Sequence, residues 1–153
     1  MNGHSLKKRI RSGEPCVGGW LALANPAIAE ILCNAGCDWL AIDLEHSPTS
    51  LETTQELIRT IDGCGRTALV RLSGHDPVQI KRVMDAGAHG IIVPNVTTLQ
   101  QLQAVHAAMH YPPVGNRGVG LGRAQGYGVG FDSYRSWLAE EAILVAQIEH
   151  KDA

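Results

Sequence analysis

The sequence lacks the features that mark most membrane and nucleic-acid-binding proteins. No apolar stretch approaches the about 20 consecutive residues that a transmembrane helix needs, and the first four residues lack the apolar core of a signal peptide. The formal net charge is only −2, and no basic face of the kind that nucleic acid or anionic lipid requires stands out. We therefore expect a cytoplasmic protein that acts on small molecules, with no nucleic-acid or membrane partner.

Several common site motifs are also missing. The four cysteines form no C-x-x-C pair, which favours small buried thiols in a reducing compartment over a metal or redox site. The glycine-rich stretch 115–130 never satisfies G-x-G-x-x-G, and neither a Walker A nor a G-x-S-x-G motif occurs. His106 and His110 have a metal-binding spacing but no third ligand nearby. Dinucleotide-binding, P-loop and serine-hydrolase functions are therefore disfavoured.

Short β-rich runs alternate with amphipathic stretches, a rhythm typical of βαβ units. The predicted strands are 17–23, 39–45, 68–72, 91–93 and 143–149. Helix-start signals follow the first four strands, at Asn25-Pro26, Thr49-x-x-Glu52, Asp76-Pro77 and Thr98-x-x-Gln101. A long glycine-rich stretch, predicted to be functional or mobile, and a short helix at 133–140 precede the fifth strand. This rhythm alone does not choose between a barrel and an open, doubly wound sheet.

Side-chain alternation in two strands favours the barrel. In the second strand Asp43 and Glu45 lie on the face opposite to the apolar residues, and in the fifth strand Gln147 and Glu149 do the same. An open sheet covered by helices on both faces would leave these groups without partners, whereas the C-terminal mouth of a barrel holds active sites. We predict an α/β fold of the parallel (β/α)₈ TIM-barrel type, with residues 1–153 forming the first five β/α units and strands six to eight absent.

Three strand ends bring groups suited to enolate chemistry to this mouth. Arg71 could stabilise an oxyanion, His46 could move a proton near neutral pH, and a carboxylate at a strand end could hold a divalent metal. Each residue also has a structural alternative when it is taken singly. Asp43 and Glu45 could cap the next helix or pair with the arginine, and the histidine could be an ordinary surface residue. The hypothesis of enolate chemistry rests on the occurrence of all these groups together at the same end of the strands.

An ordered set of short motifs resembles the HpcH/HpaI family of class II pyruvate aldolases. The motifs are Gly19-Trp20, Ile42-Asp43-Leu44-Glu45-His46-Ser47-Pro48, Val70-Arg71, Asp85-Ala86-Gly87-Ala88, Ile92-Val93-Pro94, Tyr111-Pro112-Pro113-x-Gly115-x-Arg117-Gly118 and Gln147-Ile148-Glu149. The resemblance spans nearly the whole chain. It implies a TIM barrel that uses Mg²⁺, Mn²⁺ or Co²⁺ to cleave 4-hydroxy-2-oxo acids reversibly into pyruvate and an aldehyde.

The resemblance also implies roles for single residues. His46 matches the catalytic base, Arg71 the residue that stabilises the pyruvate enolate, and Glu149 the first metal-binding carboxylate. Gln147 matches a contact to pyruvate. The family resemblance further favours a homo-oligomer of complete barrels.

Three further matches concern the surroundings of the histidine. Asp43 and Asp85 match acids that orient it and its water network, and Trp20 matches a residue that lines the pocket. The departure from the family is length, because a full barrel of this type needs about 250 residues. The second metal-binding aspartate and the amides that hold the pyruvate carboxylate are expected beyond residue 153. The residues that select the aldehyde are expected partly beyond residue 153 and partly in the glycine-rich stretch.

Two other hypotheses remain open. The chain could be complete and non-catalytic, associating with another chain that supplies the missing strands. It could instead belong to another enolate lyase on the same barrel, such as a citryl-type lyase.

Overall fold

Five parallel strands form a single sheet at the centre of the chain. The computed structural model describes residues 5–151 and 153. The strands are β1 (Gly18–Leu21), β2 (Trp39–Asp43), β3 (Thr67–Arg71), β4 (Gly90–Val93) and β5 (Ile143–Ala146). The helices are α1 (Leu6–Arg11), α2 (Pro26–Asn34), α3 (Leu51–Gly63), α4 (Pro77–Asp85), α5 (Leu99–Met109), the 3₁₀ helix η1 (Arg123–Gly128) and α6 (Phe131–Glu141).

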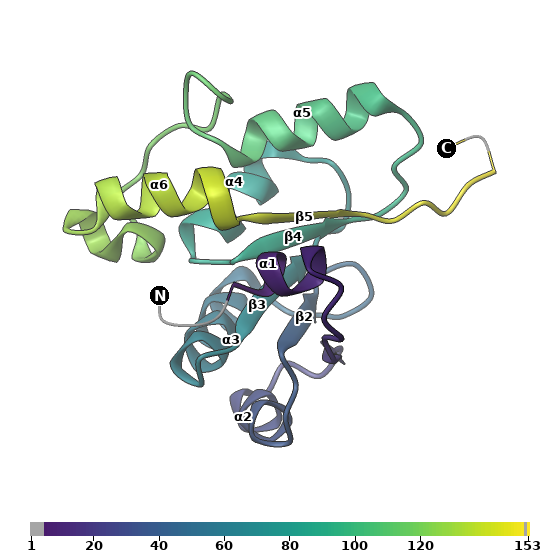
Figure 1. Ribbon diagram of the computed structural model, residues 1–153, viewed down its shortest axis with the longest axis vertical. Coiled ribbons are helices and arrows are strands. Elements are labelled where there is room, and N and C mark those ends of the chain that lie inside the picture. The colour runs from purple at the N-terminus through teal and green to yellow at the C-terminus, as the bar shows by residue number, and fades with distance from the viewer. Residues whose placement is uncertain (1–4, 152) are drawn as a thin grey trace.

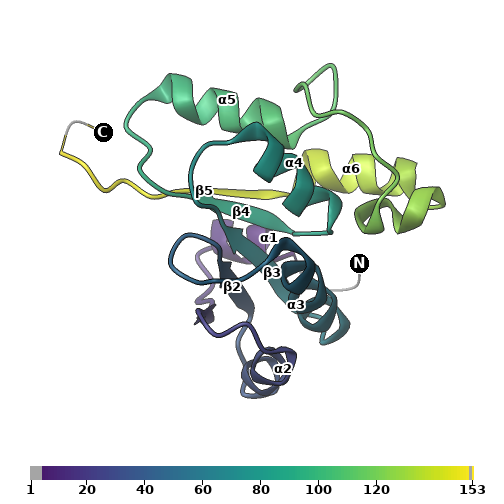
Figure 2. The same ribbon diagram turned by 180° about the vertical axis from the view of Figure 1, so that it is seen from behind.

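The order of the strands in the sheet is the order in the sequence, β1-β2-β3-β4-β5. A doubly wound sheet reverses its strand order partway, and this sheet does not. Helices α3, α4, α5 and α6 all lie on the same face of the sheet (Figures 1 and 2). A singly wound parallel sheet with its helices on one side is the arrangement of a (β/α) barrel, so the predicted fold and its five strands are confirmed.

Local sequence signals explain where the helices begin. The side chains of Asn25 and Asp76 accept hydrogen bonds from the first turns of α2 and α4, each with proline at the first helical position. Thr98 forms the predicted capping box of α5. The capping box predicted at Thr49 is wrong, because Ser50 is the N-cap of α3 and its hydroxyl accepts the hydrogen bond instead.

The two faces of the sheet carry different apolar clusters. The face toward the helices is the main core, where Leu40, Ile42 and Val70 are fully buried. Burying each such side chain contributes about 1.5–3 kcal/mol. The opposite face holds a smaller cluster of Ala41, Leu69 and Ile92, with Trp39 and Ile143 packed against it. The alternation read from the sequence is therefore confirmed in β2. We call this second face the open face.

Helix α1, which the sequence did not predict, lies on the open face (Figures 1 and 2). Its Lys7 Nζ donates to the carbonyl of Ala142, 2.9 Å away, and its Arg9 Nη1 lies 2.6 Å from Asp38 Oδ1. Ala142 and Asp38 directly precede β5 and β2, so the helix covers the open face where these strands begin. The other end of the open face is the C-terminal end, where barrel enzymes have their active sites.

The glycine-rich stretch 115–130 also lies at the N-terminal ends of the strands. Arg117 Nη2 lies 2.6 Å from Asp85 Oδ1, and Arg123 Nη2 lies 2.6 Å from Asp62 Oδ2. Both aspartates stand at the ends of helices that lead back to the beginning of the next strand. Within one chain, this position does not support the expectation that the stretch selects the aldehyde.

The helices of the described residues are too short or too polar to cross a membrane.

Candidate functional site

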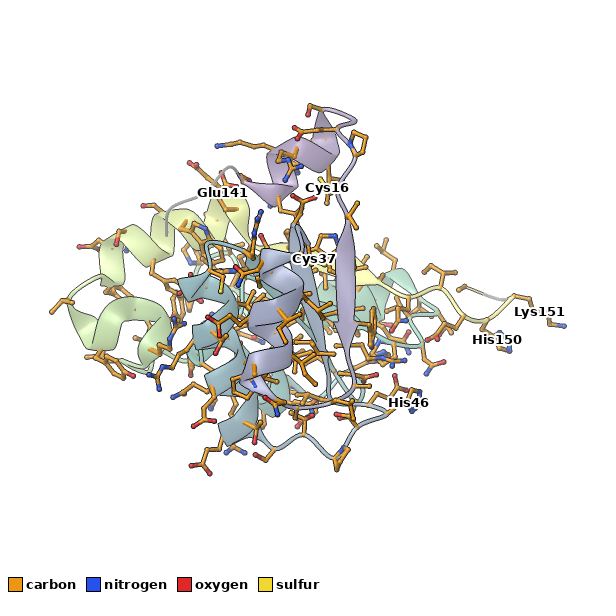
Figure 3. All side chains as sticks on the ribbon, turned by 90° about the horizontal axis from the view of Figure 1, so that it is seen from below. Cys16, Cys37, His46, Glu141, His150 and Lys151 are labelled. Atoms are coloured by element: carbon orange, nitrogen blue, oxygen red, sulfur yellow. The ribbon has the colours of Figure 1, made fainter. Side chains whose placement is uncertain are left out.

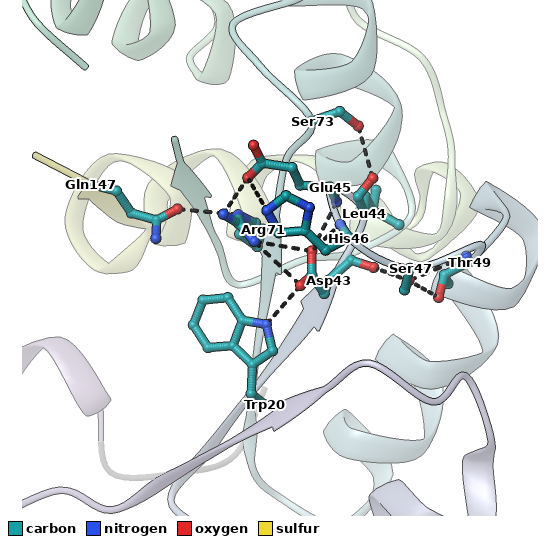
Figure 4. Close-up of polar contacts among 10 residues, drawn as sticks. All are labelled: Trp20, Asp43, Leu44, Glu45, His46, Ser47, Thr49, Arg71, Ser73 and Gln147. Carbon is teal, nitrogen blue, oxygen red and sulfur yellow. Dashed lines mark hydrogen bonds and ion pairs between the residues drawn. The ribbon is translucent and has the colours of Figure 1, made fainter. Parts of the chain in front are cut away.

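A buried ion pair marks the C-terminal ends of β2 and β3. Asp43 and Arg71 are the last residues of these strands and are register partners. Arg71 Nη1 lies 3.4 Å from Asp43 Oδ1 and 3.3 Å from Oδ2, and both residues are buried (Figure 4). The structural alternative that paired these two residues is therefore confirmed. It does not conflict with a role in catalysis, because the pair lies where barrel active sites form.

The Asp43 carboxylate receives hydrogen bonds from two sides. The indole Nε1–H of Trp20 donates to Oδ2 at 3.0 Å, and the backbone N–H groups of Glu45 and His46 donate to Oδ1 at 2.8 and 3.1 Å. Burial opposes ionisation and is the largest single influence on the Asp43 pKa, but these donors and the charge of Arg71 outweigh it, so the pKa lies below its usual value. Asp43 is therefore a carboxylate that fixes the turn after β2.

The guanidinium of Arg71 is held by acceptors from three residues. Its Nε donates to Gln147 Oε1 at 3.2 Å, its Nη1 contacts Asp43, and its Nη2 pairs with Glu45 Oε2 (Figure 4). The guanidinium carbon also lies 5.8 Å from the ring centroid of Trp20. Each terminal nitrogen carries two N–H groups, so these contacts leave donors that an anionic ligand can use.

His46 lies beside this cluster and faces solvent. Its side chain is 70% exposed, and its Nε2 lies 3.9 Å from Glu45 Oε2. The hydrogen bond that links His46 to Asp43 involves the backbone N–H, not the imidazole. Figure 3 shows His46 at the opposite end of β1 from Cys16. The imidazole is thus accessible to a substrate that also contacts the arginine.

Glu149 follows β5 at the same end of the sheet. Its Oε2 accepts a hydrogen bond of 2.8 Å from the backbone N–H of Asn95, which follows β4. Asn95 has a positive φ of 53°, and the contact with Glu149 fixes this turn against the segment after β5. Gln147 and Glu149, two residues apart, both reach the C-terminal end as the sequence predicts.

Asp85 does not join the other predicted site residues. It ends α4, which runs from the C-terminal end of β3 back to the N-terminal end of β4, and its carboxylate pairs with Arg117. The prediction that it orients His46 is therefore not supported within one chain. The physical reason is the direction of the helix, since the last residue of a crossover helix lies at the opposite end of the sheet from the active-site mouth.

The described residues alone do not fit a divalent-metal site. Among them, no group of three histidine, cysteine or acidic side chains could hold an ion. Glu149 offers one carboxylate, whereas Mg²⁺ takes about six oxygen ligands. His106 and His110 stack with ring centroids 4.1 Å apart, and Nδ1 of His110 donates to the His106 carbonyl at 2.8 Å.

Glu45 is the site residue to which the sequence assigned no role in the reaction. Its carboxylate contacts both Arg71 and His46. The signal was present in the sequence, because strand alternation places Glu45 on the same face as Asp43. The pair of Glu45 with Arg71, offered above as a structural alternative, is present, and what the sequence could not show is that the same carboxylate oxygen also lies near the His46 imidazole.

The fold and these side chains define part of a (β/α) barrel whose polar groups gather where barrel enzymes bind their substrates. Residues 17–153 match the family model described as HpcH/HpaI aldolase/citrate lyase, and the chain therefore belongs to this family.

Individual relatives agree with this assignment. The chain is 42% identical over 147 residues to a 4-hydroxy-2-oxovalerate aldolase of Novosphingobium aromaticivorans, covering 95% of this chain and 56% of the relative. It is 37% identical to a hydroxypyruvate/pyruvate aldolase of Roseobacter denitrificans, covering 97% and 58%. The crystal structure of an HpcH/HpaI aldolase/citrate lyase family protein from Burkholderia cenocepacia superposes with a TM-score of 0.89 at 32% identity, covering 97% and 60%. The chain thus spans little more than half the length of the proteins it matches.

Proposed function

We propose that this chain carries the base and the anion-binding arginine of an aldolase that cleaves 4-hydroxy-2-oxo acids into pyruvate and an aldehyde. One observation carries the proposal. Arg71 is fixed by three acceptors at the barrel mouth, directly beside an accessible His46. A rigid guanidinium suits a developing oxyanion, and histidine suits proton transfer near neutral pH.

In the proposed reaction His46 removes the proton of the 4-hydroxyl group. The C3–C4 bond then breaks and the aldehyde leaves. The electron pair of the broken bond stays with C3 and forms the enolate of pyruvate. Arg71 stabilises the negative oxygen of this enolate. Protonation at C3 gives pyruvate. We assign Gln147, which already contacts the arginine, to the binding of the pyruvate moiety, and the half-exposed Trp20 to the lining of the substrate pocket.

We further propose that Glu149 supplies one ligand to a divalent cation of the Mg²⁺, Mn²⁺ or Co²⁺ type. In this proposal residues 1–153 form one partial TIM-barrel domain, and the remaining ligands would come from strands six to eight outside these residues. A cytoplasmic homo-oligomer of completed barrels belongs to the same proposal. Mn²⁺ binding followed by electron paramagnetic resonance, with Glu149→Gln as the variant, tests this ligand.

Kinetics of site variants test the main proposal. The protein expressed from its own gene is assayed with 4-hydroxy-2-oxo acids and Mn²⁺, and pyruvate is detected with lactate dehydrogenase. His46→Ala and Arg71→Ala should each lower kcat/KM at least about 100-fold. Glu30→Gln, on the exposed surface of α2, serves as the control. Wild-type rates in both site variants would refute the assignment.

The family description also names citrate lyase, which supports a second candidate. A citryl-type lyase would form an enolate on the same barrel but from a different substrate. Parallel assays with acyl-CoA substrates and with free 2-oxo acids separate the two. Turnover of the acyl-CoA substrates alone would replace the aldolase with this lyase.

A further inference from the structure

Glu45 lies between His46, which transfers the proton in the proposed reaction, and Arg71, which binds the anion. Its Oε2 pairs with Nη2 of Arg71 and lies 3.9 Å from Nε2 of His46. The side chain is only 18% exposed, so its charge is partly shielded from water. One carboxylate oxygen therefore faces the arginine and the imidazole together (Figure 4).

The other nearby carboxylate, Asp43, is already occupied. Its two oxygens accept hydrogen bonds from the Trp20 indole and from two backbone N–H groups, and both face Arg71. A carboxylate has about four acceptor positions, and these contacts use them. Asp43 can therefore place the backbone of His46 but has no free position for its ring.

From this geometry we infer that Glu45, not Asp43, is the positioning residue for the His46 imidazole, and that it couples the imidazole to Arg71. The inference rests on the proposed function. Glu45 faces Nε2, which leaves Nδ1 to receive the proton of the 4-hydroxyl group. Once that proton has moved, the carboxylate stabilises the cationic imidazole that results.

The coupling follows from a shared charge. Without substrate, Glu45 is one of two carboxylates that pair with Arg71, and Asp43 is the other. An anionic substrate at Arg71 competes for the same guanidinium and weakens its pair with Glu45, so that the carboxylate turns toward His46. Substrate binding thereby orders the base when it is needed.

Variants of Glu45 test this in the protein expressed from its own gene, with the cleavage of 4-hydroxy-2-oxo acids as the assay. Glu45→Gln keeps the shape and removes the charge, Glu45→Asp keeps the charge, and Glu30→Gln removes a charge from the exposed surface of α2. In Glu45→Gln, kcat should fall about 100-fold while KM changes less than about threefold, since misplacement of a catalytic group has an effect of this size. Glu45→Asp should recover part of the lost turnover.

A purely structural ion pair with Arg71 would also lower kcat, because the proposed reaction gives Arg71 the stabilisation of the enolate. The order of the His46 ring separates the two roles. If Glu45 only held Arg71, the ring would be as ordered in Glu45→Gln as in wild type, and that result would overturn the inference. Urea unfolding of each variant confirms that the fold is kept. If Glu45→Gln does not fold, Glu45→Asp alone decides, because a lengthened contact to His46 should still make the ring more mobile than in wild type.

A second measurement separates failure of this inference from failure of the proposed function. Carbon-13 relaxation at Cε1 of His46, measured with pyruvate added as the anion at Arg71, reports the order of the ring without any cleavage. With pyruvate present, the ring should be more mobile in Glu45→Gln than in wild type and unchanged in Glu30→Gln. An unchanged ring would overturn the role of Glu45. Absence of 4-hydroxy-2-oxo acid cleavage in the wild-type protein would instead overturn the proposed function, and the ring measurement would still decide for or against Glu45.

Discussion

The indole Nε1–H of Trp20 on β1 donates a hydrogen bond of 3.0 Å to Oδ2 of Asp43 on β2. Trp20 pairs with Ala41 in the strand register, so its ring reaches two residues along the neighbouring strand to make this contact. The bond ties the edge strand to the ion pair at the mouth. It also contributes to the low pKa of Asp43.

Trp20→Phe removes this donor and keeps a ring. We expect a loss of about 1–3 kcal/mol at pH 7, because the acceptor is charged. The folded-state pKa of Asp43 is depressed, so the stabilisation is present above the unfolded value of about 3.9 and is lost as the pH falls through the folded value. Urea unfolding of both proteins should show a difference that shrinks from pH 7 to pH 3. A difference independent of pH would contradict this origin.

Asp85→Ala tests the structural role of a residue to which the family resemblance gives a catalytic one. Its partner Arg117 has a side-chain exposure of 0%, and removing the carboxylate leaves this cation buried and unpaired. We expect a loss of about 3–5 kcal/mol in urea unfolding. Asp132→Ala is the control, since this side chain is 90% exposed and should change stability by less than about 0.5 kcal/mol. Unaltered stability with lost activity would favour the catalytic role.

Gly90→Ala should disrupt the joint between β4 and β5. A Cβ at Gly90 would clash with the backbone oxygen of Ile143, an atom that moves only if the strand moves. We expect a loss of at least about 2 kcal/mol in thermal or urea unfolding. Gly63→Ala, at the end of α3 with no atom within 4 Å of the added Cβ, should be neutral or gain up to about 1 kcal/mol. Equal losses of stability at the two positions would show that the close approach of Gly90 to Ile143 does not cause the destabilisation.

His106→Gln should make the fold less sensitive to mild acid. Burial lowers the pKa of His106, and the nearby charges of His110 and Lys7 lower it further. The unfolded chain therefore binds the proton more readily than the folded one, so stability is complete above about pH 6.5 and falls as the pH drops through the folded value. Unfolding free energies measured between pH 7.5 and pH 5 should decline less steeply in the variant. An identical slope would assign the acid sensitivity to other groups.

Much of the site was predictable because its residues lie at strand ends. Arg71 and Asp43 end neighbouring strands, and parallel strands bring their C-terminal ends to one edge, so their proximity follows from the pattern alone. The position of Asp85 did not follow in the same way. A family motif names the residue, but the direction of α4 decides which end of the sheet it occupies.

Helix α1 shows the limit of local signals. It spans six residues with one buried side chain, Leu6, and so short a helix is not stable from its own sequence. Contacts from Lys7 to Ala142 and from Arg9 to Asp38 hold it in place, and these partners are distant in the sequence.

The alternation of strands and helices, most of the helix caps and the two faces of β2 follow from the amino-acid sequence alone, because they depend on residues a few positions apart. Three relationships required the folded chain: the strands follow one another without reversal, Asp43 has no position left for the His46 ring, and Glu45 lies between His46 and Arg71. These relationships join segments from different strands. They arise when the sheet buries its apolar face and its charged side chains take the partners that remain within reach.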